Sequence, residues 1–155
     1  DPAKGLALVE RVVDEARIAM CSEAVGAMEE SLKITVEYLK TRKQFGVAIG
    51  TFQALQHRAS DMFVNLEQAR SMALFAAMAT DLPEDERATA VAAAKVQVGK
   101  SSKFVGQQSI QLHGGIGMTM EASIGHYFKR LSMIESSFGD TDYHLRRVAA
   151  AGSLV

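Results

Sequence analysis

The two prolines of this chain, Pro2 and Pro83, constrain its fold more than any other feature of the sequence. A proline inside a helix removes a backbone hydrogen bond and clashes with the preceding turn. The stretch between these two prolines is therefore free to form long helices. Apolar residues make up 48% of the chain and charged residues 23%, which is typical of a soluble globular domain with an ordinary core.

The first long stretch has apolar side chains at helical spacing. This pattern predicts one helix over about residues 4–41. Gly26, inside it, costs about 1 kcal/mol relative to alanine, and we interpret it as a site of close helix packing rather than a break. The apolar positions are Leu6, Val9, Val13, Ala16, Met20, Ala24, Ala27, Leu32 and Leu39.

Further helices follow. The segment "RKQFGVAIGT" interrupts the pattern, and a second helix then runs to about Thr80. "DLPEDE" begins a third helix over about 84–112, because proline suits a first turn and acidic side chains suit the positive end of the helix dipole. "HGGIGM" ends it, and shorter helices fit 121–134 and 140–151. Strand signals are almost absent, so we predict one all-α domain over 1–155, an up-and-down bundle resembling a four-helix bundle.

Charge and cysteine content narrow the class of protein. The formal net charge is −1, which argues against a nucleic-acid or membrane-surface partner. No uncharged run is long and apolar enough to cross a membrane. The single cysteine, Cys21, is expected to be a small buried hydrophobe in a reducing compartment, which we take to be the cytoplasm. The chain begins "DPAKGL" without a methionine, so we expect it to be a piece of a longer protein.

Metal and nucleophile sites have little support. The chain has no Glu-x-x-His pair and no Gly-x-Ser-x-Gly motif. "DTDYH" gathers Asp140, Asp142 and His144, which allows a metal site, but we favour a helix N-cap and predict no metal. "HGGIG" has two interpretations: a helix stop, or a glycine backbone that a ligand can approach closely.

The segment "YLKTRKQFG" is similarly ambiguous. Its cations complement the carboxyl end of a helix dipole, which alone would explain them. The end of a helix does not require the neighbouring phenylalanine, glutamines and glycines, so these residues allow a binding role as well. A guanidinium suits a phosphate or a carboxylate, and an amide beside an aromatic face suits a flat heterocycle.

Several segments taken together resemble the acyl-CoA dehydrogenase family, and specifically its C-terminal helical domain. They are "YLKTRKQFG", "FQALQHRASDM" and "QLHGGIGMTMEASIGHYFKR", in a matching helical order. The family's N-terminal helical domain and middle β-domain are not in this sequence. The resemblance implies an FAD-dependent oxidoreductase that desaturates acyl-CoA between its α and β carbons. It also implies a dimer or tetramer with itself or a related subunit, and an electron-transfer flavoprotein or similar acceptor.

The resemblance also assigns site residues. It implies that Arg42, Gln44 and Phe45 contact the FAD of a neighbouring subunit. It implies that four further residues lie on the flavin side, namely Gln53, Gln111, Gly114 and Gly115. It places Arg17, on the first helix, near the catalytic pocket.

The usual catalytic glutamate is missing from the matching position. Counting from Gly114 without gaps places Phe138 where the family has its glutamate. Some members carry the base on the first helix, where this chain has Ala16. Asp140 and Asp142 are weak surrogates, because a carboxylate at a helix start is held ionised by N–H groups and loses basicity.

Two hypotheses about function remain open. In the first, the full-length protein is an acyl-CoA dehydrogenase or its non-catalytic subunit, and the present chain alone is inactive. In the second, the domain is a helical oligomerisation module that binds no flavin.

Overall fold

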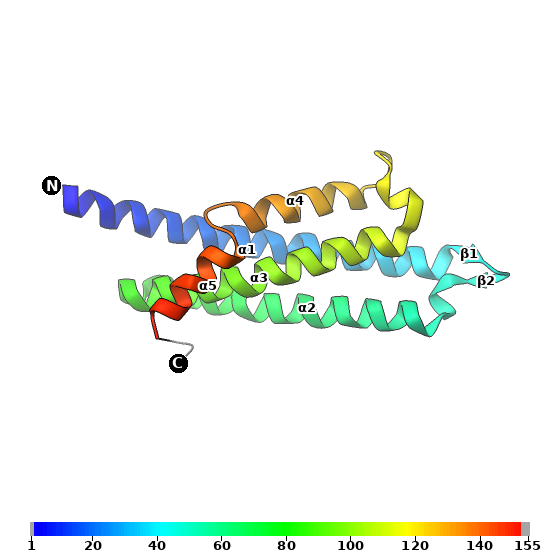
Figure 1. The fold of residues 1–155 in the computed structure, drawn as a ribbon, viewed down its shortest axis with the longest axis horizontal. Helices are drawn as coiled ribbons and strands as arrows, with labels where there is room; N and C mark the ends of the chain where they lie inside the picture. Colours follow the sequence, from blue (N-terminus) through cyan, green and yellow to red (C-terminus); the bar gives the residue numbers. More distant parts are fainter. Residues whose placement is uncertain (1, 153–155) are drawn as a thin grey trace.

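The computed structural model describes residues 2–152 and confirms the all-α prediction (Figure 1). The first helix is continuous, and the third ends at His113, one residue beyond the predicted end. The helices are α1 (Pro2–Thr41), α2 (Gln53–Met78), α3 (Glu84–His113), α4 (Ile124–Ser136) and α5 (Thr141–Ala150), with 3-10 turns η1 (Ile49–Thr51), η2 (Ala79–Asp81) and η3 (Gly114–Met118). The fourth helix begins at Ile124 rather than near 121, because η3 and a turn occupy the segment before it.

The first four helices run alternately up and down, as predicted, and α5 lies against α3 (Figure 1). Helix α3 is central and contacts each of the other helices. Its buried residues are mostly alanine, valine, serine and glycine, whose small side chains let neighbouring helices approach. The core between the helices contains the larger buried side chains Met28, Met62, Leu66, Val98, Val105, Leu131 and Ile134.

A short β-hairpin joins α1 to α2, which the sequence did not predict. Strand β1 (Lys43–Gln44) pairs antiparallel with β2 (Val47–Ala48). The two residues of the turn, Phe45 and Gly46, have φ of 55° and 81°. Positive φ at both central positions defines the tight hairpin turn whose twist matches that of paired strands. Two-residue strands are too short to produce a periodic signal, so the turn was the only cue.

Two expectations about single residues have opposite outcomes. Cys21 is fully buried, as predicted. The expectation of close packing at Gly26 is wrong for this chain, because Gly26 is exposed and a Cβ there would meet no atom within 4 Å. The helix nevertheless continues through it.

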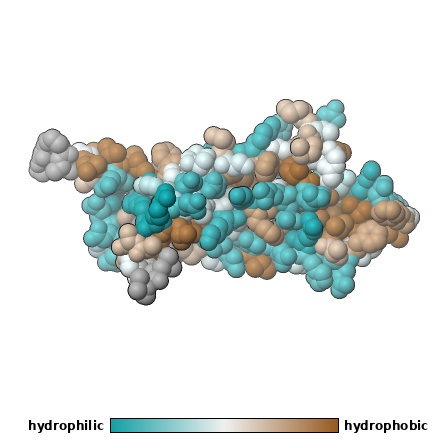
Figure 2. All heavy atoms as spheres, in the orientation of Figure 1, coloured by the Kyte–Doolittle hydropathy of each residue, from teal (hydrophilic) through white to brown (hydrophobic). Residues whose placement is uncertain are grey.

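Apolar side chains remain exposed in several places. Figure 2 shows them at the end of the bundle that carries the β-hairpin and on the projecting start of α1. Leu6, Leu8, Val9 and Val12 of α1 are 56–64% exposed, and Phe45 at the hairpin tip is 90% exposed. Exposed apolar patches often mark contact surfaces.

Candidate functional site

The predicted flavin-side residues lie on segments that meet at one end of the bundle. The end of α1, the hairpin and the start of α2 lie there, beside the end of α3 (Figure 1). The Tyr38 ring stacks on the His113 ring with 4.5 Å between centroids, which joins α1 to α3. Arg58 at the start of α2 donates to Gln108 of α3 at 3.2 Å. We call this surface the hairpin end.

The hairpin end presents polar donors and an aromatic ring to solvent. The side chains of Arg42, Gln44, Gln53 and Gln111 are exposed, and Phe45 contacts Phe52 edge-on at 6.1 Å. These groups could bind phosphates and a flat heterocycle, so their chemistry fits a flavin dinucleotide. Their contacts with a flavin stay a prediction.

The glycines after α3 end the helix and leave space beside it. Gly114 is the C-cap of α3, with φ of 62°, which confirms the helix-stop interpretation. A Cβ at Gly114 or Gly115 would meet no atom within 4 Å. The second interpretation, a backbone open to a ligand, is therefore compatible with the same geometry.

The second candidate region is the turn between α4 and α5, far along the bundle from the hairpin end (Figure 1). Phe138 has φ of 55° and Gly139 has φ of 102°. The Phe138 carbonyl oxygen accepts hydrogen bonds from Arg17 Nε at 3.0 Å and from His144 Nε2 at 3.1 Å. Arg17 on α1 therefore lies beside the Phe138 turn, and Ala16 is its chain neighbour.

Two of the three carboxylates near this turn are engaged in structural bonds. Asp140 is the N-cap of α5 and accepts from the Tyr143 amide at 2.7 Å, which confirms the predicted cap. Glu135 Oε1 accepts from the amide and hydroxyl of Thr141 at 3.0 and 2.9 Å. Asp142 lies exposed in the first turn of α5.

Two arginines and one aspartate form a buried cluster beneath the turn. Asp14 accepts from Arg17 at 3.0 Å and from Arg87 at 3.4 Å, and all three are at most 8% exposed. An ion pair this deeply buried is destabilised strongly when one partner is lost. The sequence analysis did not identify Asp14 or Arg87 as members of a buried cluster.

Lys95 supports the end of α4 from within the core. It is 2% exposed, and its ammonium donates to the carbonyls of Ile134 at 2.8 Å and Ser137 at 2.9 Å. Burial lowers the pKa of Lys95 below its ordinary value. Burial likewise raises the pKa of the Cys21 thiol to about 11, which keeps this cysteine protonated and unreactive.

His144 is fully buried beside the turn. Burial, and after it the charge of Arg17, lowers the pKa of His144 to about 4. The imidazole is therefore neutral near pH 7.

Within residues 2–152, no group of three or more His, Cys, Asp or Glu side chains is arranged to hold a metal ion. No helix of that part of the chain is long and apolar enough to span a membrane.

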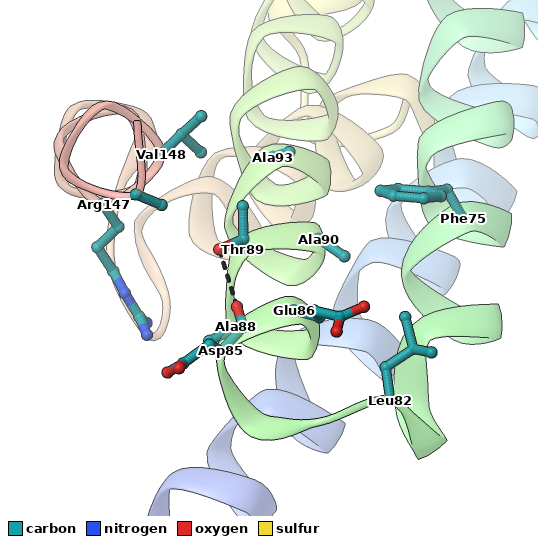
Figure 3. A pocket seen from close by; sticks show the side chains of 11 residues that line it. Phe75, Leu82, Asp85, Glu86, Ala88, Thr89, Ala90, Ala93, Arg147 and Val148 are labelled. Carbon is teal, nitrogen blue, oxygen red and sulfur yellow. Dashed lines mark hydrogen bonds between the residues drawn. The ribbon is translucent and has the colours of Figure 1, made fainter. Parts of the chain in front are cut away.

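A groove of about 910 Å³ lies apart from both regions, between α2, α3 and α5 (Figure 3). Its walls include Phe75, Leu82 and Val148, with small alanine side chains from α3. Figure 3 shows Asp85 and Arg147 at its edge. None of the predicted site residues lines it.

The family model "Acyl-CoA dehydrogenase, C-terminal domain" matches residues 3–153. The chain belongs to the acyl-CoA dehydrogenase family, and the predicted fold and family are confirmed.

Two curated relatives illustrate the match. "Acyl-CoA dehydrogenase IpdE2" of Mycobacterium tuberculosis is 40% identical over 119 residues, covering 77% of this chain and 36% of the relative. "Probable acyl-CoA dehydrogenase YngJ" of Bacillus subtilis is 32% identical over 156 residues, covering 100% of this chain and 40% of the relative. The chain thus spans well under half the length of these relatives.

Solved structures share the fold. The "Tcur3481-Tcur3483 steroid ACAD G363A variant" aligns with a TM-score of 0.85 and 32% identity, covering 91% of this chain and 39% of that one. The ChsE4-ChsE5 complex of Mycobacterium tuberculosis aligns with a TM-score of 0.85 and 26% identity, covering 92% and 39%. A structure named "PigA with FAD and proline" aligns with a TM-score of 0.83 and 29% identity, covering 92% and 37%.

Proposed function

We propose that this chain is the C-terminal domain of an FAD-dependent acyl-CoA dehydrogenase whose usual catalytic glutamate is replaced by Phe138. The domain contributes flavin contacts at the hairpin end and part of an oligomer interface. The family match and the FAD-containing structural relative support FAD as the cofactor of the full-length assembly. A cytoplasmic location fits a chain whose single cysteine, Cys21, cannot form an internal disulfide.

The residues of the hairpin end would hold FAD by complementary chemistry. The Arg42 guanidinium suits the phosphates, while the amides of Gln44, Gln53 and Gln111 suit polar edges of the cofactor. Phe45 offers an exposed aromatic face. Bound FAD would supply the acceptor for the hydride lost from the β-carbon of an acyl-CoA, while a base would take the α-proton.

The observation that carries the missing-base proposal is the engagement of three of the four carboxylates around the Phe138 turn; the fourth, Asp142, is exposed to solvent in the first turn of α5. A base must come within about 3 Å of the proton that it removes and must be free to accept it. Asp140 caps α5, Glu135 binds Thr141, and Asp14 is buried between two arginines. Phe138 itself, at 49% exposure, cannot accept a proton.

The glutamate would then come from a related subunit. Two of the matched structures are named for pairs of proteins, which supports an assembly of this chain with a catalytic relative. In such an assembly this chain supplies flavin contacts and interface, and the relative supplies the base. An electron-transfer flavoprotein or similar acceptor would reoxidise the flavin.

The test uses the full-length protein purified alone and with its related subunit. We expect a yellow protein that binds FAD but does not turn over acyl-CoA with an artificial electron acceptor until the subunit is added. Robust turnover by the protein alone would contradict the missing base. A colourless protein that refuses FAD on reconstitution would instead favour the oligomerisation module that binds no flavin.

A further inference from the structure

One backbone oxygen in the turn before α5 accepts hydrogen bonds from two different helices. Arg17 Nε of α1 and His144 Nε2 of α5 both lie within 3.1 Å of the Phe138 carbonyl oxygen. Residues other than glycine persist at positive φ only where the surrounding structure holds them there. Phe138 has φ of 55°, and these two donors hold it there.

The geometry fixes which nitrogen of His144 carries hydrogen. A carbonyl only accepts, so Nε2 is the protonated nitrogen and Nδ1 of the neutral ring is an acceptor. Nδ1 is buried and has no partner among the described residues. A second proton there would find no acceptor, and the resulting cation would face Arg17 of α1, Lys95 of α3 and Arg147 of α5. Three acidic groups of the region are already bonded, namely Asp14, Glu135 and Asp140, and the fourth, Asp142, is exposed to solvent.

The orientation of the carbonyl determines where the side chain of residue 138 goes. With the carbonyl turned toward the interior, that side chain is left 49% exposed. Gly139 follows with φ of 102°, and a Cβ there would lie 2.9 Å from His144 Nε2. The imidazole and the Tyr143 ring therefore fill the space beside the glycine.

We propose that His144 is a positioning residue: as a neutral Nε2–H donor it acts with Arg17 to lock the Phe138 turn and to present side chain 138 on the substrate side. This inference rests on the proposed function, in which position 138 faces the acyl-CoA. It adds His144, which acts on the backbone of the turn. This role does not depend on which side chain is present at position 138.

The first test compares variants of the full-length protein in its assembly by hydrogen–deuterium exchange of the amides at 138–144. His144→Gln keeps an N–H donor near the Nε2 position, His144→Leu removes it, and His126→Leu alters an exposed histidine on α4 as the matched control. We expect about tenfold faster exchange in His144→Leu, because this change removes one hydrogen bond. We expect His144→Gln and His126→Leu to keep the protection of the wild-type protein.

Unchanged exchange in His144→Leu, or an equal loss in His144→Gln, would overturn the donor role. If His144→Leu does not fold, His144→Asn takes its place, because its shorter amide stays polar but does not reach the Phe138 carbonyl.

The second test measures separately whether the side chain at position 138 faces the substrate. In a Phe138→Glu background we expect acyl-CoA to bleach the flavin, His144→Leu to slow this about tenfold, and His144→Gln to restore it. Bleaching that His144→Leu leaves unchanged would overturn the positioning role. If exchange behaves as expected but Phe138→Glu never bleaches the flavin, the substrate-facing part of the proposal is wrong, and with it the proposed role of position 138, while the hydrogen-bonding role of His144 stands.

Discussion

Replacing Lys95 by methionine would remove the ammonium that holds the end of α4. Its Nζ donates to the carbonyls of Ile134, Glu135 and Ser137 at 2.8, 3.3 and 2.9 Å. These are carbonyls at the end of a helix, which have no partner within the helix itself. Methionine has a similar length and apolar volume, so the change removes hydrogen bonds with little loss of packing.

The expected loss of stability in Lys95→Met follows from two opposing contributions. A hydrogen bond to a charged group contributes about 1.5–3 kcal/mol, so the two shorter bonds give about 3–6 kcal/mol. Against this, the ammonium is desolvated, as its lowered pKa shows, and its removal relieves part of that penalty. We expect a net loss of about 2–4 kcal/mol, confined to the end of α4 and the turn after it.

Native-state hydrogen exchange of the full-length protein measures this local loss directly, because it reports the free energy of opening segment by segment. The matched control is Lys100→Met, on the same helix but exposed. Exchange at 134–141 should accelerate in Lys95→Met and stay unchanged in Lys100→Met. A change under about 0.5 kcal/mol in Lys95→Met, the size of an ordinary surface substitution, would refute the support role.

Three further predictions concern the same region. Asp14→Ala leaves two buried arginines without their carboxylate and should destabilise the protein by about 3–5 kcal/mol in thermal unfolding, whereas Glu23→Ala, which breaks an exposed pair, should cost under about 1 kcal/mol; equal losses would contradict the burial argument. Gly139→Ala should cost about 1–3 kcal/mol, because φ is 102° and a Cβ would collide with the Tyr143 ring, and unchanged unfolding would show that the turn relaxes. The pKa of His144 falls from 6.5 to about 4 on folding, so the free energy of unfolding is highest where this histidine is neutral in both states, above about pH 6.5. It should fall by about 3 kcal/mol as the pH drops through this window toward about 4. His144→Gln should flatten that part of the stability–pH curve, and an unaltered curve would exclude the histidine as its cause.

The long helices were predictable because their signals are local and repeated. Two prolines set their limits, and the acidic turn after Pro83 marked the start of α3. The cap at Asp140 was also predictable, because an aspartate after a glycine at a helix start has few other roles. The hairpin escaped prediction because each strand has only two residues, and the expectation for Gly26 failed because nothing in this chain packs on it.

The candidate site was predictable only in part, for a different physical reason. The resemblance placed Arg17 and Phe138 in one region, and the structure joins them through a side chain-to-carbonyl bond. The partners of this bond lie 121 residues apart, so no local pattern connects them. Lys95 and His144 were not predicted to support the turn. In the sequence each is a single polar residue, and its role becomes visible only when its tertiary partners are known.

The most direct test of the missing base is an anaerobic mixing experiment with the full-length protein purified alone. Acyl-CoA is added, and the visible absorbance of the bound flavin is followed without any electron acceptor. We predict that the flavin stays oxidised in the wild-type protein and is bleached after Phe138→Glu. Rapid bleaching in the wild-type protein would show that this chain already supplies a base, and would contradict the central claim.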